Sequence, residues 1–173
     1  MATQSTSFLF AFGAVVDMPL LHHIYHKRNK VSACPGEELT FKPKLSRGSM
    51  IRVLIAEDSP NIRDSLSDLL SQEPDMDLVG AAGDGLEAVE KADALRPNVV
   101  IMDAQMPKPD GIEATRRIKK SQLEVGILFF SVFTDYVEES IAAGSDGYVT
   151  KDCSPADLFS EIRRIAAAGN SKS

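Results

Sequence analysis

Acidic residues follow two apolar runs of this sequence. Glu57 and Asp58 come directly after Ile51–Ala56, and Asp103 comes directly after Val99–Met102. If these carboxylates meet, they repel, because two unit charges about 4 Å apart cost on the order of 4 kcal/mol at an effective dielectric constant near 20. Mg²⁺ removes that cost, since it prefers carboxylate oxygens and often completes its shell with a phosphoryl group. The three residues therefore predict a site for magnesium and phosphate.

Two later predicted strands end in a hydroxyl and in an amine. Ser131 ends Val125–Ser131, and Lys151 ends Gly147–Lys151. An aspartate beside a divalent cation can act as a nucleophile toward phosphorus and form an acyl phosphate. Lys151 would balance charge on the transferring group, and the Ser131 hydroxyl would donate to one of its oxygens. The pattern predicts phosphoryl transfer to Asp103.

Strands and helices alternate from Met50 onward, and they must bring these residues together. The expected strands are Ile51–Ala56, Asp77–Ala82, Asn98–Asp103, Val125–Ser131 and Gly147–Lys151. The expected helices are Pro60–Gln72, Leu86–Leu95, Gly111–Lys120, Asp135–Ala143 and Pro155–Ala168. Such alternation predicts an α/β fold with a parallel sheet and right-handed crossovers. We expect a flavodoxin-like, doubly wound sheet in the order 2-1-3-4-5 with helices on both faces, so that the first and third strands meet at the switch point.

Each residue taken alone has an ordinary explanation. Asp103 could begin a turn or cap a helix, and Lys151 could be a surface lysine. Ser59 is the expected N-cap of the helix that Pro60 opens. The basic cluster Arg116, Arg117, Lys119 and Lys120 is most simply a solvated helix face. Five suitable residues at the ends of four predicted strands are much harder to explain in this way.

Several motifs surround these strand ends. They are Leu54-Ile55-Ala56-Glu57-Asp58, Met102-Asp103 followed by Met106-Pro107 and Asp110-Gly111, Ser131, and Gly147-Tyr148-Val149-Thr150-Lys151-Asp152. In combination they make residues 50–168 similar to the receiver domain of two-component response regulators. The stretches Asp110–Lys119 and Gly147–Asp152 most resemble the branch that usually continues into a LuxR-type helix-turn-helix. The resemblance covers 119 of the 173 residues.

The resemblance implies a role for each matching residue. Asp103 would be the phosphoacceptor for a sensor histidine kinase, and Asp58 and the backbone carbonyl of Gln105 would join it around Mg²⁺. Glu57 would hold the ion partly through water. Ser131 and Lys151 would contact the phosphoryl group, and the rotation of the Tyr148 ring would report the state of Ser131.

The implied function is a phosphorylation-dependent signalling receiver that switches a surface facing a partner or effector, in transcriptional regulation. It would not be an enzyme, apart from slow autodephosphorylation. Ala104 and Gln105 lie where family members vary and hydrolysis is tuned, and Val132 is larger than the Ala or Gly of many receivers. A homodimer could form on phosphorylation through Leu158, Phe159, Ile162 and Ile165, although a stripe facing the core explains most of these residues more simply.

Two other functions remain open at this point. A Mg²⁺-dependent phosphohydrolase of the haloacid-dehalogenase kind would also use Asp103 as nucleophile, but it needs a second Asp two residues later, where Gln105 stands. A flavodoxin-like FMN-binding module needs a phosphate loop rich in Ser, Thr or Gly after the first strand. Here that loop opens with Glu57-Asp58, which would repel phosphate without a metal.

The charge divides the chain in two. Residues 1–49 carry six Lys or Arg against three Asp or Glu, whereas residues 50–173 carry thirteen against twenty-two. An acidic domain does not favour direct binding to nucleic acid, because phosphate contacts need clustered Lys and Arg.

Cys34 and Cys153 match no metal or redox spacing, which favours a cytoplasmic location. No apolar run approaches the roughly 18 residues that span a bilayer.

Residues 1–49 do not resemble the receiver. The apolar run Phe8–Val16 has no Lys or Arg before it, so it lacks the basic start of a signal peptide. His22, His23 and His26 could ligate a metal on a helix, although a fourth ligand is not evident. We expect residues 1–49 to be a tag, upstream read-through or disordered extension and residues 50–170 to be the receiver. Since the sequence stops at Ser173, we expect no DNA-binding domain in this chain.

Overall fold

A five-stranded parallel sheet in the order β2-β1-β3-β4-β5 lies at the centre of the fold. The computed structural model describes residues 50–107 and 109–169. The expectations for Phe8–Val16 and for the three histidines lie outside the described residues. The predicted fold class and strand order are confirmed.

All of the predicted strands and helices form, with bounds that differ by a few residues at most. The strands are β1 (Ile51–Ala56), β2 (Met76–Ala82), β3 (Val99–Met102), β4 (Gly126–Ser131) and β5 (Gly147–Thr150). The helices are α2 (Pro60–Ser71), α3 (Gly85–Leu95), α4 (Gly111–Ser121), α5 (Val137–Ala143) and α6 (Pro155–Gly169). Within the described part, no helix is both long enough and apolar enough to cross a membrane.

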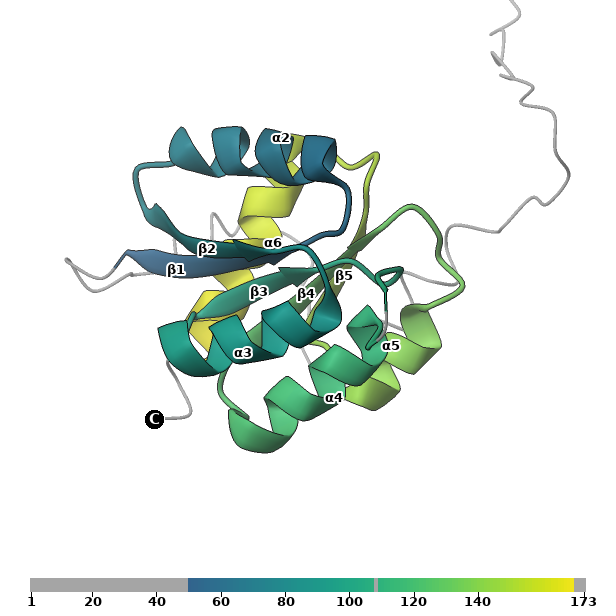
Figure 1. Ribbon diagram of the computed structural model, residues 1–173. Coiled ribbons are helices and arrows are strands. Elements are labelled where there is room, and N and C mark those ends of the chain that lie inside the picture. The colour runs from purple at the N-terminus through teal and green to yellow at the C-terminus, as the bar shows by residue number, and fades with distance from the viewer. Residues whose placement is uncertain (1–49, 108, 170–173) are drawn as a thin grey trace, which may run out of the picture. The chain divides into compact units, whose positions relative to one another are not determined.

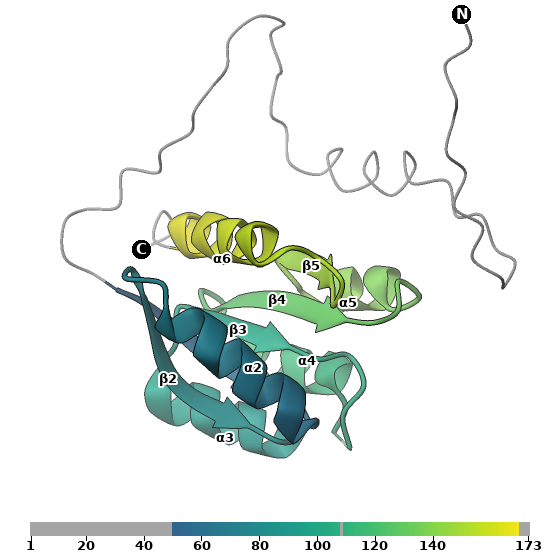
Figure 2. The ribbon, with the colours of Figure 1, turned by 90° about the horizontal axis from the view of Figure 1, so that it is seen from above.

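Helices cover both faces of the sheet (Figures 1 and 2). Helices α2 and α6 lie on one face, and α3, α4 and α5 lie on the other. Successive residues of β3 alternate between the two layers, as a strand requires. Val99 and Ile101 pack beneath α2 and α6, whereas Val100 and Met102 pack beneath α3 and α4. All four are at most 1% exposed, so β3 is a central strand buried on both sides.

The apolar stripe of α6 is part of this core. Leu158, Phe159, Ile162 and Ile165 are between 0% and 7% exposed. They pack with β1, β3 and β4 residues on the face that α6 shares with α2. The simpler explanation of this stripe, that it faces the core, is therefore confirmed.

The predicted N-cap position of α2 is confirmed, and the predicted solvated face of α4 is wrong at one residue. Ser59 occupies the N-cap position of α2, but its side chain makes no capping hydrogen bond. Arg116, Arg117 and Lys120 are exposed, as a solvated basic face requires. Lys119 is not part of that face, because its side chain is only 11% exposed. Its ammonium donates to the Asp146 carboxylate at 2.6 Å and to the Val125 carbonyl at 2.7 Å. Lys119 therefore fastens α4 to the chain segments that enter β4 and β5.

Gly111 allows α4 to begin directly against the end of β3. A Cβ atom added at this position would lie 1.9 Å from the backbone carbonyl oxygen of Asp103. No side chain fits in that space without a backbone shift. Asp110 caps the same helix, with its side chain accepting from the Glu113 backbone N–H at 2.9 Å. The Asp110-Gly111 pair thus sets the position of α4 relative to Asp103.

Candidate functional site

Three carboxylates meet where β1 and β3 end. Glu57 and Asp58 directly follow β1, Asp103 directly follows β3, and one ligand oxygen from each lies within 4.8 Å of the others. Glu57 is 1% exposed and Asp103 is 5% exposed, whereas Asp58 is exposed to solvent. The structure thus brings together the three acidic residues that the sequence placed at one edge of the sheet.

The backbone holds these residues at the end of the sheet ladder. The Asp103 N–H donates to the Ala56 carbonyl at 2.9 Å, and the Glu57 N–H donates to the Ala82 carbonyl at 3.0 Å. The Arg63 guanidinium of α2 donates to the Glu57 carbonyl at 2.7 Å. Because each strand end is bonded to its neighbour, the carboxylates converge with little freedom to separate.

Lys151 supplies the positive charge of the site. It follows β5, and its ammonium lies 2.7 Å from Glu57 Oε2 and 3.2 Å from Asp103 Oδ2. The Lys151 side chain is 14% exposed, so these contacts are largely shielded from water. The ammonium contacts two of the three carboxylates, which leaves an excess of negative charge.

Burial dominates the electrostatics of the two inner carboxyls. It raises the pKa of Glu57 and the pKa of Asp103, and Lys151 opposes both shifts. The charge of Asp58 raises the pKa of Asp103 further. Burial alone would lower the pKa of Lys151, but its hydrogen bond to Glu57 and the charge of Asp103 outweigh that effect and raise it. A cation close to the carboxylates would favour their ionised forms.

Ser131 and Tyr148 lie at the same edge on the last two strands. Ser131 is 1% exposed at the end of β4, which pairs with β3 and β5. The half-buried Tyr148 ring stacks on Phe129, with ring centroids 5.9 Å apart and an interplanar angle of 1°. Its hydroxyl donates to the Phe133 carbonyl. Burial raises the pKa of Tyr148, and a hydrogen bond with Ser131 acts against that shift.

Gln105 lies beside the site with its backbone and its side chain engaged separately. Its backbone N–H donates to Asp103 Oδ1 at 3.3 Å. Its side-chain amide donates to the Tyr136 hydroxyl at 2.8 Å. Sequence reasoning singled out the backbone carbonyl of Gln105 and did not find Tyr136 or Phe133. No motif identifies those two residues, because their contacts depend on where the loop after β4 runs.

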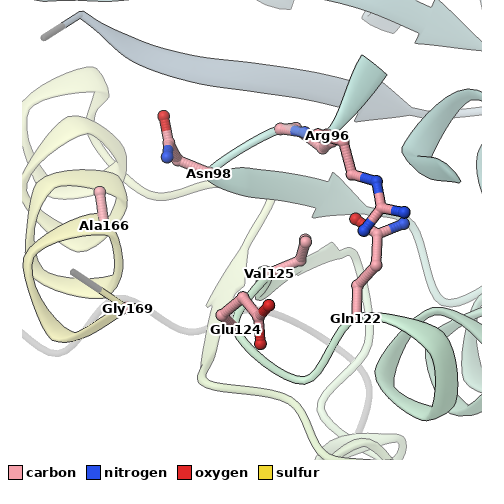
Figure 3. A pocket seen from close by; sticks show the side chains of 8 residues that line it. Arg96, Asn98, Gln122, Glu124, Val125, Ala166 and Gly169 are labelled. Atoms are coloured by element: carbon pink, nitrogen blue, oxygen red, sulfur yellow. The ribbon is translucent and has the colours of Figure 1, made fainter. Parts of the chain in front are cut away.

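A separate cavity of about 240 Å³ has none of the three acidic residues in its lining. Figure 3 shows this cavity from close by. It is lined by Arg96, Pro97, Asn98, Gln122, Glu124, Val125, Ala166 and Gly169. Gln122 is 2% exposed, and its Oε1 atom has no hydrogen-bond partner among the described residues. That oxygen is itself buried, so it is not offered to a molecule in the cavity. The acidic edge remains the candidate functional site.

Comparisons with known proteins give one consistent picture. Residues 53–163 match a family model described as the response regulator receiver domain. The chain is 38% identical over 122 residues to a protein-glutamate methylesterase/protein-glutamine glutaminase of Nocardioides sp., covering 68% of this chain and 33% of that protein. It is 37% identical over 118 residues to the uncharacterized transcriptional regulatory protein YxjL of Bacillus subtilis, covering 67% and 54%.

A solved structure agrees with these matches. A two-component response regulator of the LuxR family from Aurantimonas sp. is 34% identical, with a TM-score of 0.66 over 69% of this chain and 87% of that one. The chain spans about a third to a half of the length of the two curated relatives. The similarity therefore concerns one domain of those proteins.

Proposed function

The chain belongs to the response regulator receiver domain family, and on that premise we propose that Asp103 accepts a phosphoryl group from a histidine kinase. The observation that carries this proposal is the buried carboxylate of Asp103 between two further carboxylates and the Lys151 ammonium. A nucleophile, a charge partner and a set of oxygen ligands then occupy one edge of the sheet. Residues 50–170 would be the receiver, and residues 1–49 would be an extension that it does not need.

The residues present fit a magnesium ion. Glu57, Asp58 and Asp103 offer hard oxygen donors within 4.8 Å of one another, and their charge exceeds that of the one ammonium beside them. Asp58 and Asp103 would hold the ion together with the Gln105 backbone carbonyl, and Glu57 would act partly through water. When bound, Mg²⁺ supplies charge neutralisation for the phosphoryl oxygens.

In the proposed reaction, this chain supplies one nucleophile and two side chains that contact the transferring group. A carboxylate oxygen of Asp103 forms a bond to phosphorus, and the bond from phosphorus to the donor nitrogen breaks with its electron pair passing to that nitrogen. Lys151 balances the negative charge of the transferring group, and the Ser131 hydroxyl donates to one of its oxygens. The buried position of Asp103 limits the access of water to the product.

Phosphorylation would switch the surface beyond β4 and β5. The added phosphoryl group brings about −1.5 to −2 charges and new acceptor oxygens. Ser131 would move toward them, and the Tyr148 ring beside it would adjust with the loop that holds the Phe133 carbonyl. The output would act on a partner, a second copy of the chain or an effector domain. Relatives named as transcriptional regulatory proteins support a role in transcription.

The two alternative functions are less well supported. The Gln105 amide cannot serve as the acid and base that a fast phosphohydrolase needs, and its side chain is bonded to Tyr136. Glu57 and Asp58 occupy the loop after β1, where an FMN-binding module would need neutral donors to phosphate. We therefore propose a phosphoacceptor without fast turnover.

Labelling with a small phosphoryl donor tests the proposal directly. Incubation with Mg²⁺ and acetyl phosphate or phosphoramidate should add one phosphoryl group, measured by mass spectrometry of the intact chain. Asp103→Asn should abolish labelling, whereas Asp64→Asn, which changes an exposed carboxylate on α2, should not. Undiminished labelling of Asp103→Asn would contradict the proposal.

A further inference from the structure

A hydrogen bond joins the two loops that flank Asp103. The Gln105 side-chain amide lies in the loop between β3 and α4, and the Tyr136 hydroxyl lies 2.8 Å away in the loop between β4 and α5. Since β3 and β4 are neighbours in the sheet, the two loops leave the same edge side by side. The bond therefore bridges the loops beside the phosphoacceptor.

Both ends of this bridge are anchored. Gln105 is tied to the Asp103 carboxylate through its own backbone N–H. The Tyr136 ring packs against the core beneath α3, α4 and α5. Its backbone carbonyl accepts from the Ser140 N–H at 2.8 Å in the first turn of α5. The Tyr136 hydroxyl thus holds the Gln105 amide from a fixed position, whereas the amide itself is exposed.

The loop after β4 is also held from its other side. The Tyr148 hydroxyl donates to the Phe133 carbonyl, so β5 fixes the start of the loop and Gln105 contacts its end. At the start of this loop, Val132 is 63% exposed and Phe133 is 49% exposed. The two tyrosines therefore hold the loop at two separate points.

We propose that Tyr136 is a positioning residue that, through Gln105, sets how fast the phosphoryl group enters and leaves Asp103. This inference rests on the proposed function. The Gln105 backbone N–H contacts Asp103 Oδ1, so a side chain held by Tyr136 would stay close to one approach to the carboxylate. Without the hydroxyl, the exposed amide rotates freely and that approach opens to small donors and to water.

The same opening would speed loading and hydrolysis. In hydrolysis, the oxygen of water bonds to phosphorus, and the bond from phosphorus to the Asp103 oxygen breaks with its electron pair returning to the carboxylate. Both protons of the water remain with the released phosphate. If removal of the Tyr136 hydroxyl speeds both loading and loss, the hydroxyl restricts access to Asp103. A change in only one of the two rates would indicate an effect on that step alone.

The test compares the unmutated chain with Tyr136→Phe, Gln105→Ala and the double variant. Loading is followed with acetyl phosphate and Mg²⁺, and loss is followed after the donor is removed, both by mass spectrometry. Tyr136→Phe keeps the ring in the core and should raise both rates by about two- to tenfold, the range of one hydrogen bond. In the Gln105→Ala background, Tyr136→Phe should change neither rate, because the interaction is already absent.

Tyr148→Phe is the matched control, since it removes the hydroxyl that holds the other end of the loop. Any change that Tyr148→Phe makes to the loading and loss rates should be the same in the Gln105→Ala background, because its contact with Phe133 does not involve Gln105. Equal rates for Tyr136→Phe and the unmutated chain would overturn the inference. So would an undiminished effect of Tyr136→Phe in the Gln105→Ala background, which would show that Tyr136 acts through α5 alone. A chain that takes no label at all would contradict the proposed function itself.

Discussion

The Lys151 ammonium lies 2.7 Å from Glu57 Oε2, and this ion pair joins residues 94 positions apart in the sequence. The same ammonium lies 3.2 Å from Asp103 Oδ2. Both carboxylates are nearly inaccessible to water, with side-chain exposures of 2% and 6%. Lys151 therefore fastens the end of β5 to the ends of β1 and β3, and it compensates charge that the core would otherwise hold unpaired.

Removal of this cation should destabilise the metal-free fold. Lys151→Gln leaves two buried carboxylates without their ion pair, and we expect the free energy of unfolding at pH 7 to fall by about 3 kcal/mol. Arg117→Gln removes an exposed pair with Glu113 and should cost no more than about 1 kcal/mol. Urea unfolding measures both. Equal losses would show that the Lys151 pairs contribute no more than a surface contact.

Magnesium should stabilise the chain through the acidic edge. A ligand that binds only the folded state raises the Tm as its concentration exceeds its Kd. We therefore expect a Tm that rises with Mg²⁺ for the unmutated chain, and a higher Mg²⁺ requirement for Asp58→Asn. Asp64→Asn, on the exposed side of α2, should respond like the unmutated chain. If Asp58→Asn follows the same Mg²⁺ dependence, Asp58 is not a ligand.

The Ser131 hydroxyl should couple phosphorylation to the distal surface. Beryllofluoride with Mg²⁺ should mimic the phosphoryl group on Asp103 and shift the NMR resonances of Ser131, Tyr148 and α6, with any dimer detected by sedimentation. Ser131→Ala should still accept phosphate but lose the shifts at Tyr148 and α6. Such a switch needs several kcal/mol of differential interaction between its two states. Identical distal shifts in Ser131→Ala would rule out coupling through this hydroxyl.

Acid should weaken the contact between α6 and the turn before β2. Arg163 donates to both oxygens of Asp75 at 2.7 Å, and these bonds hold the pKa of Asp75 below its ordinary value. A carboxyl with a lower pKa in the folded state stabilises the fold above its unfolded pKa of about 4, and this stabilisation is lost as the pH falls through the folded pKa. Asp75→Asn should therefore cost about 1 kcal/mol at pH 7 and progressively less below pH about 4.

Urea unfolding across this pH range measures the Asp75 contribution. Asp77→Asn is the matched control, because Asp77 is exposed on β2 and has no ion pair among the described residues. A cost of Asp75→Asn that stays constant into acid would show that the contact does not depend on the ionised carboxylate.

A methyl group at position 111 should disturb the phosphoacceptor. Gly111→Ala places a Cβ 1.9 Å from the Asp103 carbonyl oxygen, so the backbone must shift. We expect a loss of about 1 to 3 kcal/mol in stability and slower labelling of Asp103. Gly83→Ala is the control, because its Cβ would meet its nearest neighbour at 3.5 Å. If the two variants behave alike, the close approach at Gly111 has no consequence.

Much of the fold could be predicted because its signals are local. The four-residue apolar run of β3 and the helical spacing of Ile112, Thr115 and Ile118 depend only on neighbours along the chain. Alternation of these elements then restricts the sheet to few topologies. Glu57, Asp58 and Asp103 could be placed at one edge for the same reason, since parallel strands end together. Their roles as ligands and phosphoacceptor stay predictions.

Local signals did not show which hydrogen bonds two of the side chains make. Ser59 has the residue type of a helix cap, yet its hydroxyl makes no capping bond. Lys119 follows the charge pattern of a solvated face, yet it reaches Asp146, which is 27 residues away. A long flexible side chain can bond to any acceptor within its reach, and the sequence does not show which acceptors lie there.

The sequence by itself determined the elements and the residue types at the strand ends, because periodicity and chain direction fix these, and it restricted the sheet to few strand orders. Only the tertiary structure decided how those side chains pair. The contact of Lys151 with Glu57 and the bond from Gln105 to Tyr136 join segments whose approach depends on loop paths and on packing of the whole sheet. Such contacts have no spacing rule along the chain, so their partners emerge only when the strands and helices are assembled.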